Sequence, residues 1–207
     1  MLADPPPAIV MDLGCGRGDS VDLFRRFRPE VDWVGVDIAT SFEVEQRQRT
    51  DARFVTYDGS TLPFKDASFD VVYSHQVLEH VRDPLTHLGE IRRVLRHGGA
   101  FIGSTSQLEP YHSRSYWNYT VFGFSELVAE AGLELLELRP GIDGVTLVVR
   151  SYLGRPPGFG DWFESDSPLN EQIDSWARAE GQPVVQVNLR KLQYTGQFVF
   201  LVRRPAR

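Results

Sequence analysis

Short apolar runs alternate with amphipathic stretches along the first half of the chain. Each run is too short for a helix and ends in turn-forming residues, which is typical of a buried strand. The runs predict strands at residues 8–13, 31–38, 54–56, 69–73 and 100–104. In two of the segments between them, residues 20–28 and 84–95, apolar residues recur at spacings of three and four, which indicates helices with one buried face, and residues 40–50 are expected to form a polar helix.

Three helices are expected in this half, at residues 20–28, 40–50 and 84–95. The third has the clearest boundaries, because Asp83 is a good N-cap and Pro84 suits the first helical position. The Gly98-Gly99 pair ends it. Strands that alternate with helices predict an α/β fold: a doubly wound, Rossmann-like sheet in a three-layer α/β/α arrangement.

The pattern becomes less regular after residue 104. Helices are expected at residues 125–131, 145–153 and 168–180, strands at 133–139 and 198–203, and a loop at 155–161. No repeat or low-complexity linker divides the chain. We therefore expect one domain over residues 1–207, with a core at 8–104 and further, partly inserted elements at 105–195.

A glycine-rich turn, Asp12-Leu-Gly14-Cys-Gly16-Arg-Gly18, follows the first strand. Glycines let the backbone turn tightly and let a ligand touch main-chain atoms. The G-x-G-x-G spacing differs from the G-x-G-x-x-G of dinucleotide folds, and no P-loop Gly-Lys-Ser/Thr is present. Asp19 comes next, and a carboxylate there suits an ammonium or sulfonium better than a pyrophosphate. A purely structural turn remains the alternative.

Two acids stand where further strands end. Asp37 closes the second strand, where an acid accepts hydrogen bonds from ribose hydroxyls. Asp58 follows the third strand and is placed to accept a hydrogen bond from an exocyclic amine. For Asp58-Gly59 an ordinary turn is an equally good interpretation.

Composition narrows the function further. The 207 residues hold 22 Lys and Arg against 28 Asp and Glu, a net charge of -6, which argues against a nucleic-acid partner. One cysteine, Cys15, excludes an internal disulfide framework and favours a reducing compartment. No apolar run approaches the roughly 20 residues of a membrane span, and the first residues lack a signal-peptide pattern. A cytoplasmic location is expected.

In order along the chain, these blocks resemble the class I S-adenosylmethionine-dependent methyltransferases. The resemblance covers the glycine turn, Asp37, residues 58–72, residues 74–84 and the turn at 95–99. It implies seven strands, mostly parallel with the last antiparallel. It also implies S-adenosylmethionine as methyl donor and S-adenosylhomocysteine as product.

The resemblance places the cofactor residues in the turns after the first four strands. They are Asp12, Gly14 and Gly16 at the methionine part, Asp37 at the ribose, Ile38, Asp58 and Gly59 at the adenine, and Ser74, His75 and Gln76 at the sulfonium. Residues 8–104 are then the cofactor-binding core. Residues 105–195 are the acceptor side with its inserted elements.

Residues 107–119 follow the fifth strand and are rich in aromatic and polar side chains. We expect Tyr111, Tyr116, Trp117 and Asn118 to meet the acceptor, with His112 as the base and His75 as a second catalytic residue. The segment loosely resembles methyltransferases of bacterial polysaccharide or glycan synthesis, which implies a small-molecule acceptor with a sugar-type hydroxyl. A packed lid of tyrosines is the alternative.

Gln76, Glu79 and His80 share one face if their turn is helical. The segment resembles the ubiquinone-biosynthesis O-methyltransferases, where a Glu-Glu-His set can bind a divalent metal. Gln76 stands in place of the first Glu and removes a charged ligand. We therefore expect no metal, and interpret Glu79 and His80 as braces of the turn.

Two other functions stay open. A nicotinamide-dependent oxidoreductase is disfavoured, because Thr61 and Val187, not tyrosines, stand four residues before Lys65 and Lys191. A module that binds S-adenosylmethionine without turnover is the second alternative. Residues 155–180, with Trp162 and Phe163, are expected to form a lid or the surface of a homodimer.

Overall fold

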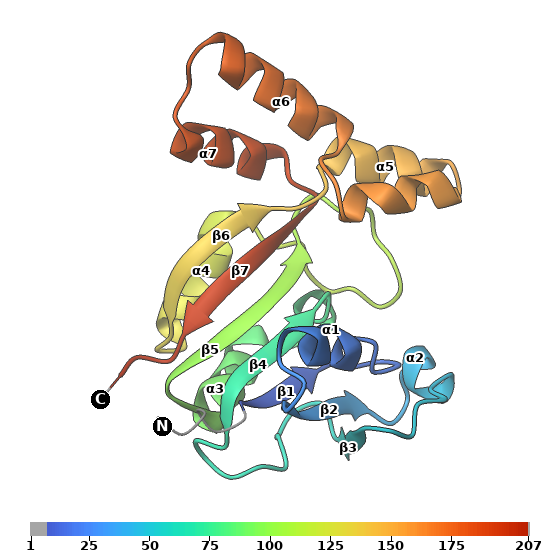
Figure 1. Cartoon of the computed structure of the whole chain (residues 1–207), viewed down its shortest axis with the longest axis vertical. Helices are drawn as coiled ribbons and strands as arrows, with labels where there is room; N and C mark the ends of the chain where they lie inside the picture. Colours follow the sequence, from blue (N-terminus) through green and yellow to red (C-terminus); the bar gives the residue numbers. More distant parts are fainter. Residues whose placement is uncertain (1–7, 207) are drawn as a thin grey trace.

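A computed structural model describes residues 8–206; the first seven residues, where the sequence lacks a signal pattern, and Arg207 lie outside the described part. Seven strands form one sheet in the order β3-β2-β1-β4-β5-β7-β6 (Figure 1). They are β1 (Ile9–Leu13), β2 (Asp32–Ile38), β3 (Arg53–Tyr57), β4 (Phe69–His75), β5 (Leu95–Ser106), β6 (Glu134–Pro140) and β7 (Gln197–Arg203). Strand β7 is antiparallel to both neighbours, and the pairs formed by β1 to β5 are parallel. The predicted fold class is confirmed.

The described residues also form helices, some on the two faces of the sheet and some beyond its end (Figure 1). They are α1 (Ser20–Phe27), α2 (Phe42–Glu45), α3 (Pro84–Val94), α4 (Val121–Glu130), α5 (Gly144–Tyr152), α6 (Pro168–Ala179) and α7 (Val184–Tyr194), with 3₁₀ helices η1 (Leu78–His80) and η2 (Pro157–Phe163). Helix α1 lies on one face, and α3 and α4 lie on the other (Figure 1). The chain therefore crosses from face to face between parallel strands, as a doubly wound fold requires.

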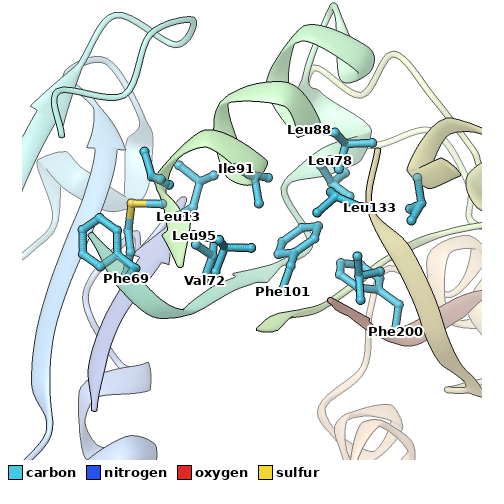
Figure 2. Packing of buried hydrophobic residues seen from close by; sticks show 14 of the residues in the cluster. Leu13, Phe69, Val72, Leu78, Leu88, Ile91, Leu95, Phe101, Leu133 and Phe200 are labelled. Carbon is cyan, nitrogen blue, oxygen red and sulfur yellow. The ribbon is translucent and has the colours of Figure 1, made fainter. Parts of the chain in front are cut away.

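The larger core cluster lies under α3 and α4. Helix α3 starts at Pro84 because Asp83 accepts a hydrogen bond from the Thr86 backbone N–H at 3.1 Å. Its buried stripe, with Leu88 and Ile91, packs over Phe101 of β5, which contacts Phe200 of β7 (Figure 2). Burying one such aromatic ring contributes roughly 1.5–3 kcal/mol. This core holds the strand ends of the cofactor half in fixed positions.

Several predicted bounds need correction. The helix expected at 40–50 is confined to α2, because the residues after it are polar and carry no apolar stripe. Helix α4 begins earlier than expected, at Val121, since the Thr120 hydroxyl caps it through the Gly123 N–H. The expected loop at 155–161 contains part of η2, and α7 was not predicted. Leu95 begins β5 instead of ending α3.

Residues 144–194 form a helical extension of α5, η2, α6 and α7 beyond the ends of β6 and β7 (Figure 1). Its two ends meet, because Asp143 and Thr195 form an antiparallel bridge. The buried Asp143 carboxylate caps α5 through the Thr146 N–H at 2.7 Å and accepts from the Leu169 N–H of α6 at 3.3 Å. One side chain thus fixes two helices to the sheet.

The helical extension also borders a groove of about 1010 Å³, which Trp162 and Phe163 line together with residues of α6 and α7. This groove is separate from the turns that the sequence assigns to the cofactor. A homodimer through this segment stays a prediction. Within residues 8–206, no helix has the length and apolar character that a membrane span needs.

Candidate functional site

The glycine turn between β1 and α1 has the backbone conformation that its sequence predicts. Gly14, Gly16 and Gly18 have φ values of +76°, +49° and +86°, a region that side chains disfavour. At Gly14 space is also lacking, since a Cβ would lie 2.3 Å from a methyl carbon of Val77. The loop after β4 therefore packs directly on the glycine turn, which brings two predicted parts of the site together.

Asp37 lies beside the glycine turn at the end of β2. One carboxylate oxygen accepts from the Gly16 N–H and the other from the Ile38 N–H, each at 2.8 Å. A carboxylate has about four acceptor positions, so each oxygen can still accept a hydroxyl. The location therefore suits the predicted contact with two ribose hydroxyls, and that contact stays a prediction.

Asp12 is almost fully buried at the end of β1. Its carboxyl accepts a hydrogen bond from the Ser20 hydroxyl, which in turn accepts from the Trp33 indole N–H at 3.0 Å. Burial raises the pKa of Asp12 to about 7, against the opposing effect of the Ser20 bond. A cation placed nearby would reverse this shift and favour the carboxylate.

The predicted adenine residues form one wall after β2 and β3. Gly59 has a φ of +86°, and the Ile38 side chain lies 3.5 Å from the position of a Cβ there. Ile38 is an exposed apolar residue at a strand end, as the wall of a pocket for a flat ring would be. Asp58 uses one oxygen to accept from the Ser60 and Thr61 N–H groups. Those backbone bonds, first the one from Thr61 and then the one from Ser60, lower the pKa of Asp58. The bonds are those of an ordinary turn, and the other carboxylate oxygen is left to accept from an exocyclic amine, so both interpretations of Asp58 remain open.

Arg47 is a site residue that the sequence analysis missed. Its guanidinium donates to the Gly16 carbonyl from two nitrogens, at 2.8 and 2.6 Å, and stacks 3.9 Å above the Phe54 ring. This clamp fixes the glycine turn from the segment after α2. The sequence pattern does not indicate this role, because a helix over residues 40–50 would place its arginines in solvent. Arg47 in fact lies after the end of α2.

Three residues at the end of β4 were predicted to border the sulfonium. His75 accepts from or donates to the Ser104 hydroxyl at 2.7 Å, and its partial burial lowers its pKa. Gln76, with a φ of +54°, bonds the Ser104 and Ser106 hydroxyls through its amide. The Ser74 hydroxyl is buried and has no hydrogen-bond partner among the described residues. His75 and Gln76 therefore reach the surface of the site, whereas Ser74 lies beneath it.

A polar cluster joins β5 to the turn η1. The fully buried Glu79 carboxylate accepts from the Thr105 hydroxyl at 3.0 Å and the Ser106 hydroxyl at 3.4 Å. Burial raises its pKa to about 7. The His80 and His112 rings meet edge to face with centroids 5.3 Å apart. One ligand atom from each of Glu79, His80 and His112 can be chosen so that all three lie within 4.8 Å of one another.

The predicted acceptor residues lie on a loop that crosses η1. The Trp117 indole donates to the Val81 carbonyl at 2.8 Å, and the Asn118 amide donates to the Glu109 carbonyl at 2.9 Å. Tyr111 and Tyr116 are exposed. Trp117 and Asn118 thus anchor the loop, and all four predicted acceptor residues are exposed.

A seven-stranded sheet in this order, with a glycine turn after β1 and an acid at the end of β2, is the fold of the class I methyltransferases. The match is more specific in the cofactor half: residues 11–103 match the family described as "Methyltransferase domain". This matched stretch, which is less than half of the chain, thus resembles a methyltransferase domain in sequence as well as in fold.

Two curated relatives match the same half. A protein of Mycolicibacterium smegmatis, named a probable S-adenosylmethionine-dependent methyltransferase, is 35% identical over 138 residues, covering 61% of this chain and 52% of that protein. The malonyl-[acyl-carrier protein] O-methyltransferase of Herminiimonas arsenicoxydans is 37% identical over 105 residues, covering 51% and 40%. The chain therefore spans about half the length of these relatives or less.

A solved structure shares the fold over almost the whole chain. It is the 1,6-didemethyltoxoflavin-N1-methyltransferase of Burkholderia thailandensis, with 1,6-didemethyltoxoflavin and S-adenosylhomocysteine bound. Its TM-score is 0.58 at 20% identity, covering 96% of this chain and 72% of that one. The acceptors named for these two proteins, malonyl-[acyl-carrier protein] and 1,6-didemethyltoxoflavin, are not glycans, so the glycan-synthesis resemblance stays a prediction.

Proposed function

We propose that the protein transfers a methyl group from S-adenosylmethionine to a hydroxyl of a small polar acceptor of sugar or glycan type. The proposal is supported mainly by one observation. The glycine turn, Asp37 and the polar cluster of η1 and β5 all lie at the carboxyl ends of the parallel strands. Ligands of open α/β sheets bind in this place, outside the carboxyl ends of the strands.

The residues present suit the methyl donor. Asp37 has acceptor positions left for ribose hydroxyls, Ile38 offers an apolar wall beside Gly59, and Asp12 offers a carboxyl to the methionine ammonium or the sulfonium. When bound, S-adenosylmethionine supplies an electrophilic methyl group, and S-adenosylhomocysteine is the product. The protein's own task is to align the acceptor oxygen with that methyl group and to exclude water.

The acceptor hydroxyl must lose a proton as its oxygen is methylated. His112 is our assignment for the residue that activates this oxygen. It lies on the loop after β5, its Nδ1 lies 3.2 Å from the Pro110 carbonyl, and Glu109 stands 3.7 Å away. His75 is the second candidate, because it adjoins Gln76 and the glycine turn. Tyr111 and Tyr116 provide exposed rings on which a sugar face can stack.

Calorimetric titration with S-adenosylhomocysteine, S-adenosylmethionine and NADH is the first test. Binding of the first two without the third is expected; the reverse would revive the oxidoreductase hypothesis. Transfer of labelled methyl to a panel of sugars and phenols then tests the acceptor. Donor binding without transfer to any acceptor would favour the binding-module hypothesis, and transfer only to phenols would overturn the sugar assignment.

Variants of the two histidines test the catalytic assignment. His112→Ala should lower turnover at least tenfold while the affinity for S-adenosylhomocysteine is unchanged. His75→Ala, nearer the glycine turn, should change donor affinity as well. Full turnover in His112→Ala would remove that residue from the reaction.

A further inference from the structure

The cluster of Glu79, His80 and His112 has the composition of a metal site. One carboxylate and two imidazoles suit first-row divalent ions such as Mn²⁺, Fe²⁺, Co²⁺ and Zn²⁺. Bound at about 2.1 Å, ligand atoms of one ion lie no more than about 4.2 Å apart. Those of the cluster lie within 4.8 Å of one another, so a small closing movement brings them into range.

Hydrogen bonds to the backbone hold both imidazoles. His112 Nδ1 lies 3.2 Å from the Pro110 carbonyl, a contact that needs a proton on Nδ1 and leaves the Nε2 lone pair open. The His80 ring is bonded to the Arg114 backbone. Metal-binding histidines nearly always donate their other N–H to a carbonyl or carboxylate.

Glu79 supplies the negative charge. It is fully buried, and the Thr105 hydroxyl donates to one of its oxygens at 3.0 Å. Its charged neighbours are Glu109 and His112, neither of which is a permanent cation. A buried carboxylate is costly unless a cation or several hydrogen bonds compensate it. A metal ion would provide that compensation.

We propose that Glu79, His80 and His112 bind a divalent transition-metal ion at the acceptor side of the site. The proposal departs from the expectation of no metal drawn from Gln76, because it takes its third ligand from another loop, whereas the Gln76 amide bonds Ser104 and Ser106. The position is near the glycine turn, since η1 directly follows Val77, whose side chain packs on Gly14.

The chemical role of the ion rests on the proposed function. A bound ion would accept the acceptor oxygen as a ligand and lower the pKa of its hydroxyl. In that arrangement His112 acts by holding the ion. Metal binding itself needs neither donor nor acceptor, so it can be tested separately.

The test is titration of the chelator-treated full chain with Co²⁺, followed by visible absorption and calorimetry. We expect one ion per chain at micromolar affinity, and at least tenfold weaker binding in both Glu79→Gln and His112→Ala. His97→Ala, an exposed histidine at the start of β5, is the matched control and should bind like the parent.

Binding that is absent at millimolar Co²⁺, or that both site variants retain, would overturn the proposal. If Glu79→Gln does not fold, as judged by circular dichroism, His112→Ala on the loop decides the question. Titration of the chelated protein with S-adenosylhomocysteine separates the two hypotheses. Donor binding without metal binding rejects the metal site alone, and metal binding without donor binding rejects the proposed function.

Discussion

The cofactor half and the acceptor side position their functional groups by different means. In residues 8–104 these groups are backbone turns and acids at strand ends, so the parallel sheet itself fixes their places. In residues 105–119 they sit on a loop held by individual hydrogen bonds, such as that from Trp117 to Val81. Substitutions that disturb the backbone conformation should therefore have their largest effect on stability in residues 8–104. In residues 105–119, substitutions that remove a single side-chain hydrogen bond should have the larger effect.

The largest effect is expected at the glycine turn. Gly14→Ala should destabilise the protein by about 3 kcal/mol, because its Cβ would collide with Val77 and its φ is positive. Urea unfolding measures this. Gly89→Ala is the matched control: it lies in α3 with open space around it and should stabilise by about 0.5–1 kcal/mol. Equal stability of both variants would show that the turn is adaptable.

Acid should destabilise the cofactor half, because His87 of α3 is buried in its neutral form. Burial lowers the pKa of this histidine from 6.5 to about 4. Between pH 6.5 and 4, the His87 imidazole is therefore neutral in the folded protein and protonated in the unfolded chain. The free energy of unfolding is therefore unaffected by the titration of His87 above pH 6.5. It falls as the pH drops toward 4, by on the order of 3 kcal/mol in total. The difference in unfolding free energy between the parent and His87→Leu, measured at pH 7 and 4.5, isolates this term. A difference independent of pH would contradict it.

Asp37→Ala should weaken S-adenosylmethionine binding by about 1.5–3 kcal/mol, the range for hydrogen bonds to a charged group. Calorimetry measures the loss. Asp32→Ala, at the exposed opposite end of β2, is the control and should bind normally. An unchanged affinity in Asp37→Ala would mean that strand-end acids do not form the donor pocket.

The smallest effect is expected on the acceptor side. Trp117→Phe keeps an aromatic ring but loses the bond to Val81, which should cost about 1 kcal/mol of stability. Donor affinity should not change. Tyr111→Phe, on the same loop and 79% exposed, should leave stability unaltered. A change in donor affinity in Trp117→Phe would show that the two regions are coupled.

The order of strands and helices in the cofactor half could be predicted from the sequence, because each element is determined by a short, contiguous stretch of residues. Each strand is an apolar run. Gly14 follows β1 directly, and Asp37 and His75 lie at the ends of β2 and β4, so the topology alone brings them together. The acceptor side depends on contacts between distant segments, such as His112 with His80, which no spacing reveals. Helix α7 escaped prediction because its apolar residues do not form one stripe, and Val184, Val185 and Leu189 remain exposed.

The bridge between Asp143 and Thr195 places the two ends of the helical extension side by side, while Leu192 of α7 also packs into the main core and Asn188 donates to the Leu138 carbonyl of β6. Because the chain leaves and re-enters the sheet at facing residues, a short turn joining them would leave β6 and β7 as an ordinary hairpin. Extensions of other lengths could be exchanged at this point without altering the order of the strands. Residues 144–194 can therefore diverge faster than residues 8–104, whose strands are fixed by their neighbours in the sheet.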